Sequence, residues 1–398
     1  MRPDTLLVHA GEPHPRIEGA VAMPIFQSAT FETMEERALP ATGGAPEARS
    51  IGGDRGYHDI RYARLSNTPN HTALHAKIAA LEGSETALVA ASGMAAISTA
   101  LLSVLKSGDH LLAHKTLYGG THDLLTRDFV RLGIETTFVD GDAVSTWEKH
   151  LRPNTRAIYV ETLTNPLLDV GDHEGAARFA RSHDLVSFID NTFASPLGFR
   201  PIAVGFDLVL HSATKYLNGH SDLIAGAIAG SARRIEAVKH TLDHLGGSLD
   251  PHACFLLHRG LKTLGVRFRH QTASALRIAR FLAEHPAVGR VNHPGLPSHP
   301  QHERARRLLP SGTGGMLSFE MRGGRDAAER LLSRVRVPIN APSLGGTESL
   351  ITRPAATSHA GLTPEERRAA GIGDGLVRFS VGIEDPEDLI DDLREALG

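Results

Sequence analysis

The feature that most constrains the fold is a regular alternation of short apolar runs with helical patterns from residue 72 to residue 229. Apolar runs predict strands at 87–90, 109–113, 134–139, 157–161, 185–190, 206–210 and 224–229. Patterns of helical spacing fall between most of them, as at 95–105 and 174–183. Strands that alternate with helices form βαβ units, whose strands pair mostly in parallel beneath helices on both faces. We therefore expect an α/β domain with a mostly parallel sheet.

The pattern changes after residue 235, and a chain of 398 residues is long for one domain. Residues 235–282 read as mainly helical, and the part from 254 is long enough to connect two domains. Strand candidates at 316–321, 349–352 and 376–381 alternate with helical patterns at 324–335 and 386–397. We expect a large domain over 61–255 and a smaller α+β C-terminal domain over 256–398.

Residues 1–60 do not read as a compact unit. The segment 41–56 is rich in Gly, Pro and charge, which predicts a mobile loop. An arm of this kind cannot bury its own surface, so we expect it to contact another subunit; simple disorder is the alternative.

Charge and hydropathy exclude several classes of protein. The formal net charge of −3 gives no basic excess for nucleic acid. No apolar run approaches the roughly 18 residues of a membrane span, and the N-terminus lacks the apolar core of a signal peptide. Cys254 is the only cysteine, which excludes an internal disulfide and fits a reducing cytoplasm.

Four strand ends carry residues with complementary chemistry, and ligands bind at the carboxyl ends of such strands. Ser92-Gly93-Met94 opens a helix, whose first N–H groups favour phosphate. Asp190 ends an apolar strand, so its carboxylate is expected to be buried and to need a cation. Tyr118, in a Gly-rich turn, could stack on a flat ring.

Lys215 follows another apolar strand, with hydroxyl groups on Ser212 and Thr214. These hydroxyl groups could hold a phosphate while the amine condenses with an aldehyde. Singly, the four features also fit a tight turn, a packing tyrosine, an internal arginine pair and a surface lysine. Together they fit one ligand, pyridoxal phosphate (PLP), which has a phosphate, a flat ring, a protonated ring nitrogen and an aldehyde.

The chain also resembles the Cys/Met-metabolism family of PLP-dependent enzymes over nearly its whole length. This family contains cystathionine γ-synthases, γ-lyases and β-lyases, methionine γ-lyases and O-acylhomoserine sulfhydrylases. The matching segments occur in family order at 62–67, 91–96, 118–121, 161–166, 190–193, 212–220, 259–264, 343–350 and 378–384. The resemblance implies PLP fold type I, aspartate aminotransferase-like, with a seven-stranded sheet in the large domain.

The resemblance also implies roles for individual residues. Lys215 binds the cofactor aldehyde and moves protons, Asp190 pairs with the ring nitrogen, and Tyr118 stacks on the ring and is the candidate acid or base at the leaving group. The other expected cofactor contacts are Ser92, Gly93, Met94, Asn165, Thr192, Ser212 and Thr214. Substrate contacts are expected from Tyr62, Asn165, Glu348, Ser349 and Arg378, with the α-carboxylate on the last two.

Tyr62 and Arg64 match residues that reach the phosphate of the neighbouring subunit. The resemblance therefore implies a homotetramer, a dimer of dimers with shared active sites. Two departures concern this region: Asn67-Thr68-Pro69 stands where the family usually has Asn-Pro-Thr, and the Gly-rich insertion at 41–56 is long.

The sequence narrows the substrate in part. Gly120 stands where methionine γ-lyases typically carry Cys, and Glu348 matches the acid that holds the distal amino group of cystathionine. We expect γ-elimination of L-cystathionine to cysteine, 2-oxobutyrate and ammonia. The alternatives are γ-replacement by a cystathionine γ-synthase or O-acylhomoserine sulfhydrylase, and then β-lyase or methionine γ-lyase activity. From other classes, a PLP aminotransferase, a non-catalytic PLP-binding protein and a nucleotide-dependent enzyme remain.

A cluster of His293, His299 and His302 near Glu303 could suggest a metal site. The cluster lies in a Pro-rich connection, and the expected chemistry needs no metal. We interpret it as a solvated loop.

Overall fold

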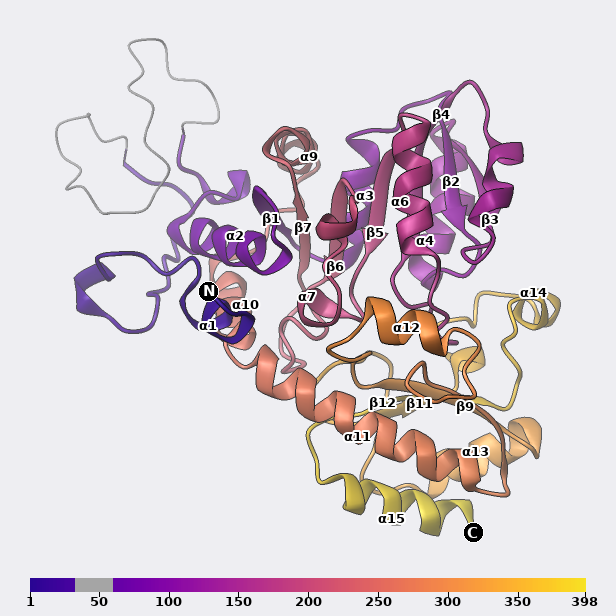
Figure 1. The fold of residues 1–398 in the computed structure, drawn as a ribbon. Helices are drawn as coiled ribbons and strands as arrows, with labels where there is room; N and C mark the ends of the chain where they lie inside the picture. The colour runs from indigo at the N-terminus through magenta and orange to yellow at the C-terminus, as the bar shows by residue number, and fades with distance from the viewer. Residues whose placement is uncertain (33–59) are drawn as a thin grey trace.

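The computed structural model describes residues 1–32 and 60–398 and shows two domains joined by a long helix (Figure 1). The expected loop at 41–56 lies outside the described residues. The N-terminus lies beside the large domain, and the chain ends on the outer side of the smaller one (Figure 1).

The large domain contains a seven-stranded sheet, as expected. Its order is β1-β7-β6-β5-β4-β2-β3, and every pairing is parallel except those of β7, which runs antiparallel to β1 and β6. The strands are β1 Thr86–Ala90, β2 His110–His114, β3 Glu135–Val139, β4 Thr155–Glu161, β5 Val186–Asp190, β6 Leu208–Ser212 and β7 Gly226–Gly230.

Helices cover both faces of this sheet because its strands are apolar on both sides. Successive strand residues point to opposite faces, and in β1 Leu88 and Val89 belong to two different apolar clusters. The longer helices are α2 Pro69–Glu82, α3 Gly93–Leu102, α6 His173–Ser182, α9 Ala232–Leu245 and α10 Pro251–Leu261. The shorter ones are α1 Pro3–His9, η1 Ile17–Gly19, η3 Ala63–Leu65, η5 Val144–His150, α7 Ser195–Gly198 and α8 Pro201–Val204.

The helix that follows Tyr118 is interrupted. It consists of α4 Gly119–Asp123, the π-helical turn η4 Leu124–Asp128 and α5 Phe129–Arg131. Such π turns insert one residue into the helical hydrogen-bond ladder, and the spacing of apolar residues along the sequence does not predict them.

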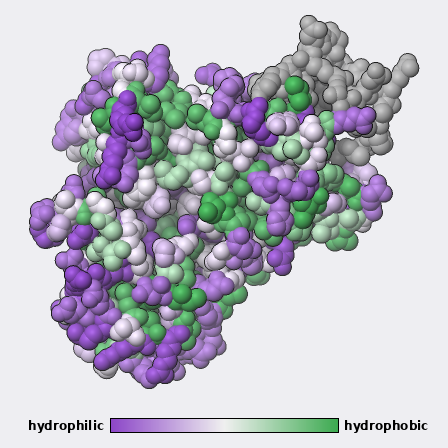
Figure 2. Space-filling model, turned by 180° about the vertical axis from the view of Figure 1, so that it is seen from behind, coloured by the Kyte–Doolittle hydropathy of each residue, from purple (hydrophilic) through white to green (hydrophobic). Residues whose placement is uncertain are grey.

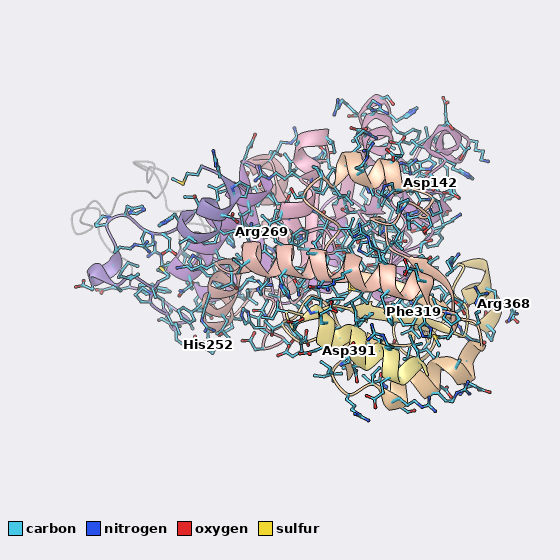
Figure 3. All side chains as sticks on the ribbon, turned by 60° about the horizontal axis from the view of Figure 1, so that its bottom comes forward. Asp142, His252, Arg269, Phe319, Arg368 and Asp391 are labelled. Atoms are coloured by element: carbon cyan, nitrogen blue, oxygen red, sulfur yellow. The ribbon has the colours of Figure 1, made fainter. Side chains whose placement is uncertain are left out.

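The connection between the domains is α11 Leu264–Glu284. Figure 3 shows it crossing from Arg269, beside the large domain, to the C-terminal domain. There it packs against α15 Pro386–Leu397 and the strand that holds Phe319. One apolar cluster, which includes Ile278, Phe379 and Leu393, forms the core of this domain.

The C-terminal domain has its own five-stranded sheet, of order β10-β11-β12-β9-β8. Its strands are β8 Val288–Asn292, β9 Met316–Met321, β10 Ile339–Asn340, β11 Leu350–Thr352 and β12 Leu376–Ser380, and its remaining helices are α12 His302–Leu308, α13 Gly324–Arg334, η6 Pro354–Ala356 and α14 Pro364–Ala369. The sequence did not predict β8, β10 or α12. Gly289 and Arg290 break the apolar pattern of β8, β10 has two residues, and α12 is short and rich in charge.

The expectation of a solvated histidine loop was wrong. His293 is 1% exposed and His299 is 5% exposed. Burial lowers the pKa of His293 to about 3 and that of His299 to about 4. The loop is buried because it packs at the junction of the domains, where His299 and Leu167 of the large domain line one cavity.

Within the described parts of the chain, no helix combines the length and the apolar character needed to cross a bilayer.

Candidate active site

A cavity of about 630 Å³ opens at the carboxyl ends of β4, β5 and β6, where the two domains meet. Most of the predicted site residues line it: Ser92, Gly93, Met94, Tyr118, Asn165, Asp190, Thr192, Ser212, Thr214, Lys215 and Arg378. The position agrees with the rule that open α/β sheets bind ligands at their carboxyl edge.

Lys215 lies in the turn after β6, and its Nζ donates a hydrogen bond to the Ser343 hydroxyl at 2.7 Å. Burial lowers the pKa of Lys215 to about 8, and the positive charge of Arg378 acts in the same direction. A lysine with a lowered pKa is partly neutral near physiological pH and can act as a nucleophile or base.

Asp190 ends β5 and faces the cavity. Its Oδ1 accepts hydrogen bonds from the backbone N–H of Thr192, at 2.9 Å, and from the Thr192 hydroxyl. That hydroxyl oxygen in turn accepts from the Ser212 N–H at 2.8 Å. Burial raises the pKa of Asp190, and none of the described residues forms an ion pair with it. A protonated ring nitrogen in the cavity would supply the missing cation.

Glu161, which the sequence analysis did not single out, lies beside Asp190. The two residues are paired in register on the parallel strands β4 and β5. Burial raises the pKa of Glu161, and the nearby Asp190 raises it further. Glu161 Oε1 also accepts the backbone N–H of Tyr118 at 2.7 Å, so it fixes the turn that carries Tyr118. The sequence does carry a signal for Glu161, because it is the last residue of the strand predicted at 157–161.

The start of α3 forms the cradle expected for a phosphate. Ser92 caps the helix by accepting the Ala95 N–H at 3.0 Å, which leaves the N–H groups of the first turn directed at the cavity. A Cβ at Gly93 would lie 2.8 Å from the Cβ of Ser212, so only glycine allows this approach. Backbone donors and the hydroxyl groups of Ser212 and Thr214 suit a phosphate group.

Tyr118 precedes α4 and remains 43% exposed, with its ring at the cavity. A Cβ at Gly120 would lie 2.6 Å from Cε1 of this ring and 3.2 Å from the sulfur of Met94. The ring therefore rests over its own turn, in space that any side chain at position 120 would occupy.

Arg378 reaches the same cavity from β12 of the C-terminal domain. It is 4% exposed and donates to Asn165 Oδ1 at 3.3 Å and to the Ser343 carbonyl oxygen at 2.9 Å. Burial lowers its pKa to about 10, so it stays charged at neutral pH. A guanidinium in this position can bind a carboxylate through two hydrogen bonds.

Ser343 is a site residue that the sequence analysis missed. Its hydroxyl accepts from Lys215 and its carbonyl accepts from Arg378. The segment 343–350 is one of those that match the family, but the resemblance assigns the substrate α-carboxylate to Ser349 and not to Ser343. Ser349 instead donates through its N–H and hydroxyl to Glu384, at 2.6 and 2.8 Å, and does not line the cavity.

Three other predicted residues also lie outside the cavity lining. Arg64 donates to the carbonyl of Asp243 at 2.6 Å and lies 5.8 Å from the ring centre of Tyr62. Glu348 is exposed and accepts from the Ser221 hydroxyl at 3.4 Å. The roles expected for these residues and for Ser349 stay predictions.

The cavity thus combines a lysine, a buried carboxylate without a cation and a phosphate cradle, which together define the class of PLP-dependent enzymes. The family model described as Cys/Met metabolism PLP-dependent enzyme matches residues 4–398, and the chain belongs to this family. The cofactor, the fold type and the predicted resemblance are therefore confirmed.

Relatives with different names are similarly close. The chain is 42% identical to a cystathionine γ-lyase of Bacillus subtilis over 398 residues (100% of this chain, 99% of the relative). It is 43% identical to an L-methionine γ-lyase of Porphyromonas gingivalis over 384 residues (95% and 93%). It is 42% identical to a cystathionine γ-synthase of Mycobacterium bovis over 400 residues (100% and 97%).

Among solved structures, the cystathionine γ-lyase of Lactobacillus plantarum complexed with L-serine superimposes with a TM-score of 0.90 at 35% identity. The match covers 100% of this chain and 98% of that one. The chain is therefore a PLP-dependent carbon–sulfur enzyme of trans-sulfuration, and the aminotransferase, non-catalytic and nucleotide-dependent alternatives are not supported.

Proposed function

We propose that the chain cleaves L-cystathionine by γ-elimination to cysteine, 2-oxobutyrate and ammonia. One observation carries the proposal: Lys215 and Arg378 both bind Ser343, the first through its hydroxyl and the second through its carbonyl. An α-amino acid whose carboxylate pairs with Arg378 therefore has its Cα close to the amine of Lys215. This arrangement suits removal of the Cα proton.

PLP supplies an electron sink at Cα when it is bound. Lys215 takes the Cα proton, which its lowered pKa favours, and removal of a second proton, from Cβ, then permits the sulfur on Cγ to leave. Asp190 holds a proton on the ring nitrogen, and Tyr118 is positioned to exchange a proton with the leaving sulfur. Arg378 and Asn165 orient the substrate carboxylate.

The distal half of cystathionine carries a second ammonium group, which Glu348 would bind. Glu348 contacts Ser221, and the segment that follows Ser221 reaches the cavity at Ile224. This carboxylate therefore lies close to the chain segment that borders the cavity, although it does not line the cavity itself.

Methionine γ-elimination is the second candidate, since the Porphyromonas gingivalis relative has this name. Gly120 counts against it, because methionine γ-lyases typically carry Cys there. γ-Replacement, as in cystathionine γ-synthase or an O-acylhomoserine sulfhydrylase, uses the same proton transfers from Cα and Cβ. It differs because a thiol then adds at Cγ. β-Lyase activity is the remaining alternative.

We also propose a cytoplasmic homotetramer with active sites shared between subunits. Tyr62 and Arg64 lie outside the cavity of their own subunit, as residues that serve a neighbour would. Figure 2 shows apolar residues on the reverse face near the N-terminal elements. In the N-terminal part of the chain, Val21 is 83% exposed and Ile60 is 53% exposed. Burial of such residues between subunits is favourable.

Product analysis tests the proposed reaction. Purified holoenzyme is incubated separately with L-cystathionine, with L-methionine, and with an O-acylhomoserine plus cysteine. Cysteine and 2-oxobutyrate from L-cystathionine, at the highest kcat/KM of the three, support the proposal. Absence of both products from L-cystathionine overturns it.

A further inference from the structure

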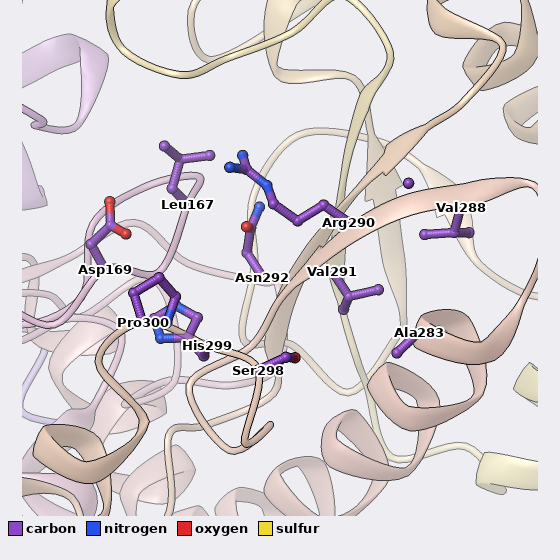
Figure 4. Close-up of a pocket in the computed structure, with 11 residues that line it drawn as sticks. Leu167, Asp169, Ala283, Val288, Arg290, Val291, Asn292, Ser298, His299 and Pro300 are labelled. Carbon is purple, nitrogen blue, oxygen red and sulfur yellow. The ribbon is translucent and has the colours of Figure 1, made fainter.

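A second cavity, of about 370 Å³, lies at another part of the domain junction (Figure 4). One wall is the large-domain loop that holds Leu167 and Asp169, and the other is β8 with residues 298–300 of the C-terminal domain. No residue of this lining belongs to the catalytic cavity. Its volume falls within the roughly 300–1,000 Å³ of small-molecule sites.

Asp169 contributes a half-buried carboxylate that is in contact with no cation among the described residues. Its Oδ2 accepts a hydrogen bond from the Thr164 hydroxyl at 3.3 Å. It forms no ion pair with any residue in the described part of the chain, and burial raises its pKa. A carboxylate removed from water is costly to keep charged unless a cation lies beside it.

Arg290 contributes the opposite charge to the same cavity. It lies on β8, across from Glu320 of β9, and its charge lowers the pKa of that carboxyl against the effect of burial, yet its side chain makes no hydrogen bond or ion pair with any described residue. In Figure 4 its guanidinium lies on the side of Leu167, and Asp169 lies across the opening. The cavity thus has a cation and an anion that attract each other without direct contact, since the positive charge of Arg290 lowers the pKa of Asp169 against the effect of burial but the two side chains form no ion pair.

The rest of the lining is neutral. Leu167, Ala283 and Val291 are apolar. Burial lowers the pKa of His299 to about 4, so its ring is uncharged near neutral pH. Asn292 donates its amide to Ser318 at 2.9 Å. A ligand that carries one carboxylate, one ammonium group and an apolar side chain matches this distribution.

We propose that this cavity binds a small α-amino acid with an aliphatic or thioether side chain, its carboxylate on Arg290 and its ammonium group on Asp169. Arginine binds a carboxylate through two parallel hydrogen bonds, and the ammonium group neutralises the buried anion. The proposal concerns a site separate from the active site and holds whichever sulfur compound is the substrate.

Calorimetric titration with L-methionine tests the site on holoenzyme whose cofactor has been fixed to Lys215 by borohydride reduction. Reduction prevents any amino acid from displacing the catalytic lysine, so this binding assay is independent of turnover. We expect saturable binding of one molecule per chain. 3-(Methylthio)propanoate, which lacks the amine, and 3-(methylthio)propylamine, which lacks the carboxylate, should each bind at least about 10-fold more weakly.

Variants test whether L-methionine binds in this cavity. Arg290→Ala and Asp169→Asn should each weaken it at least about 10-fold, whereas Arg233→Ala, a distant exposed arginine, and Arg378→Ala, in the catalytic cavity, should not change it. The thermal midpoints of the two site variants, compared with the parent, show whether they fold. Absence of saturable binding, binding unchanged in both folded site variants, or equal binding of the two analogues overturns the proposal.

Discussion

The amine of Lys215 donates to the hydroxyl of Ser343 at 2.7 Å, and this bond crosses from the large domain to the C-terminal domain. Lys215, the proposed catalytic lysine, is thus oriented by the domain that also supplies Arg378. The Lys215 amine and the Arg378 guanidinium, the proposed site for the substrate carboxylate, are therefore held by the same residue, Ser343.

Lys215→Ala should remove both the visible absorbance of the bound cofactor and turnover, with kcat lower by at least about 10³-fold. Absorbance spectra and product analysis measure the two effects. Lys149→Ala is the matched control, since Lys149 is exposed and away from the cavity. Survival of either signal in Lys215→Ala would show that the assignment of the cofactor lysine is wrong.

The rate at which the apoenzyme captures PLP should rise with pH through about 8 and level off above it. Only the neutral amine attacks an aldehyde, and with a pKa of about 8 about a tenth of Lys215 is neutral at pH 7. Stopped-flow absorbance across the pH range measures the midpoint. Arg378→Leu removes a nearby positive charge, so its midpoint should move to higher pH, while that of Arg233→Leu should not. A rate independent of pH would contradict the prediction.

Asp190→Asn should make the apoenzyme more stable near neutral pH, although the holoenzyme should lose its turnover. The pKa of Asp190 is raised in the folded chain above its value in the unfolded chain. The folded chain therefore holds the proton more tightly, and its stability falls as pH rises through the raised pKa. The variant lacks this loss, so its thermal midpoint should exceed that of the parent by a few degrees, about 2–4 °C per kcal/mol.

The gain should shrink in acid, where Asp190 is protonated in both the folded and the unfolded chain. Calorimetry of both apoproteins at neutral and acidic pH measures it. An apo variant less stable than the parent at neutral pH would argue against a costly buried carboxylate.

Gly120→Ala should lower kcat/KM by about 10-fold or more, because the added Cβ would lie 2.6 Å from the Tyr118 ring. The ring must move, and with it the group proposed to exchange a proton with the leaving sulfur. Gly361→Ala is the matched control, since a Cβ there meets nothing within 4 Å. Steady-state kinetics on L-cystathionine compare the two, and equal kinetics would show that the ring tolerates the methyl group.

The sequence predicted the parts of the fold that depend on local pattern. Most strands of the large sheet are rich in apolar residues, so their positions followed from the sequence pattern. Asp190 stood out because it ends one such strand, and Lys215 because it lies in the turn after another. β8 was missed because Gly289 and Arg290 interrupt its pattern and only pairing with β9 makes it a strand.

The role of Ser343 depends on a contact between residues 128 positions apart in the chain. No local signal separates it from Ser349, which a hydrogen bond to Glu384 holds away from the cavity. The burial of His293 and His299 likewise follows from the meeting of two domains, which periodicity within one segment does not report.

The reversed direction of β7 has a consequence for how the enzyme could vary. If β7 were parallel to β6, the chain would have to run back along the length of the sheet before β7 could begin, as it does in βαβ units. Because β7 runs antiparallel to β6, the chain leaves and re-enters the sheet at the same edge, and residues 213–225 stay entirely on the side of the cavity. The connection that carries Lys215 thus lies wholly at the end of the sheet where the cavity opens. Insertions or deletions at its exposed residues, Ser221, Asp222 and Ile224, would reshape the entrance without disturbing the strand order beneath.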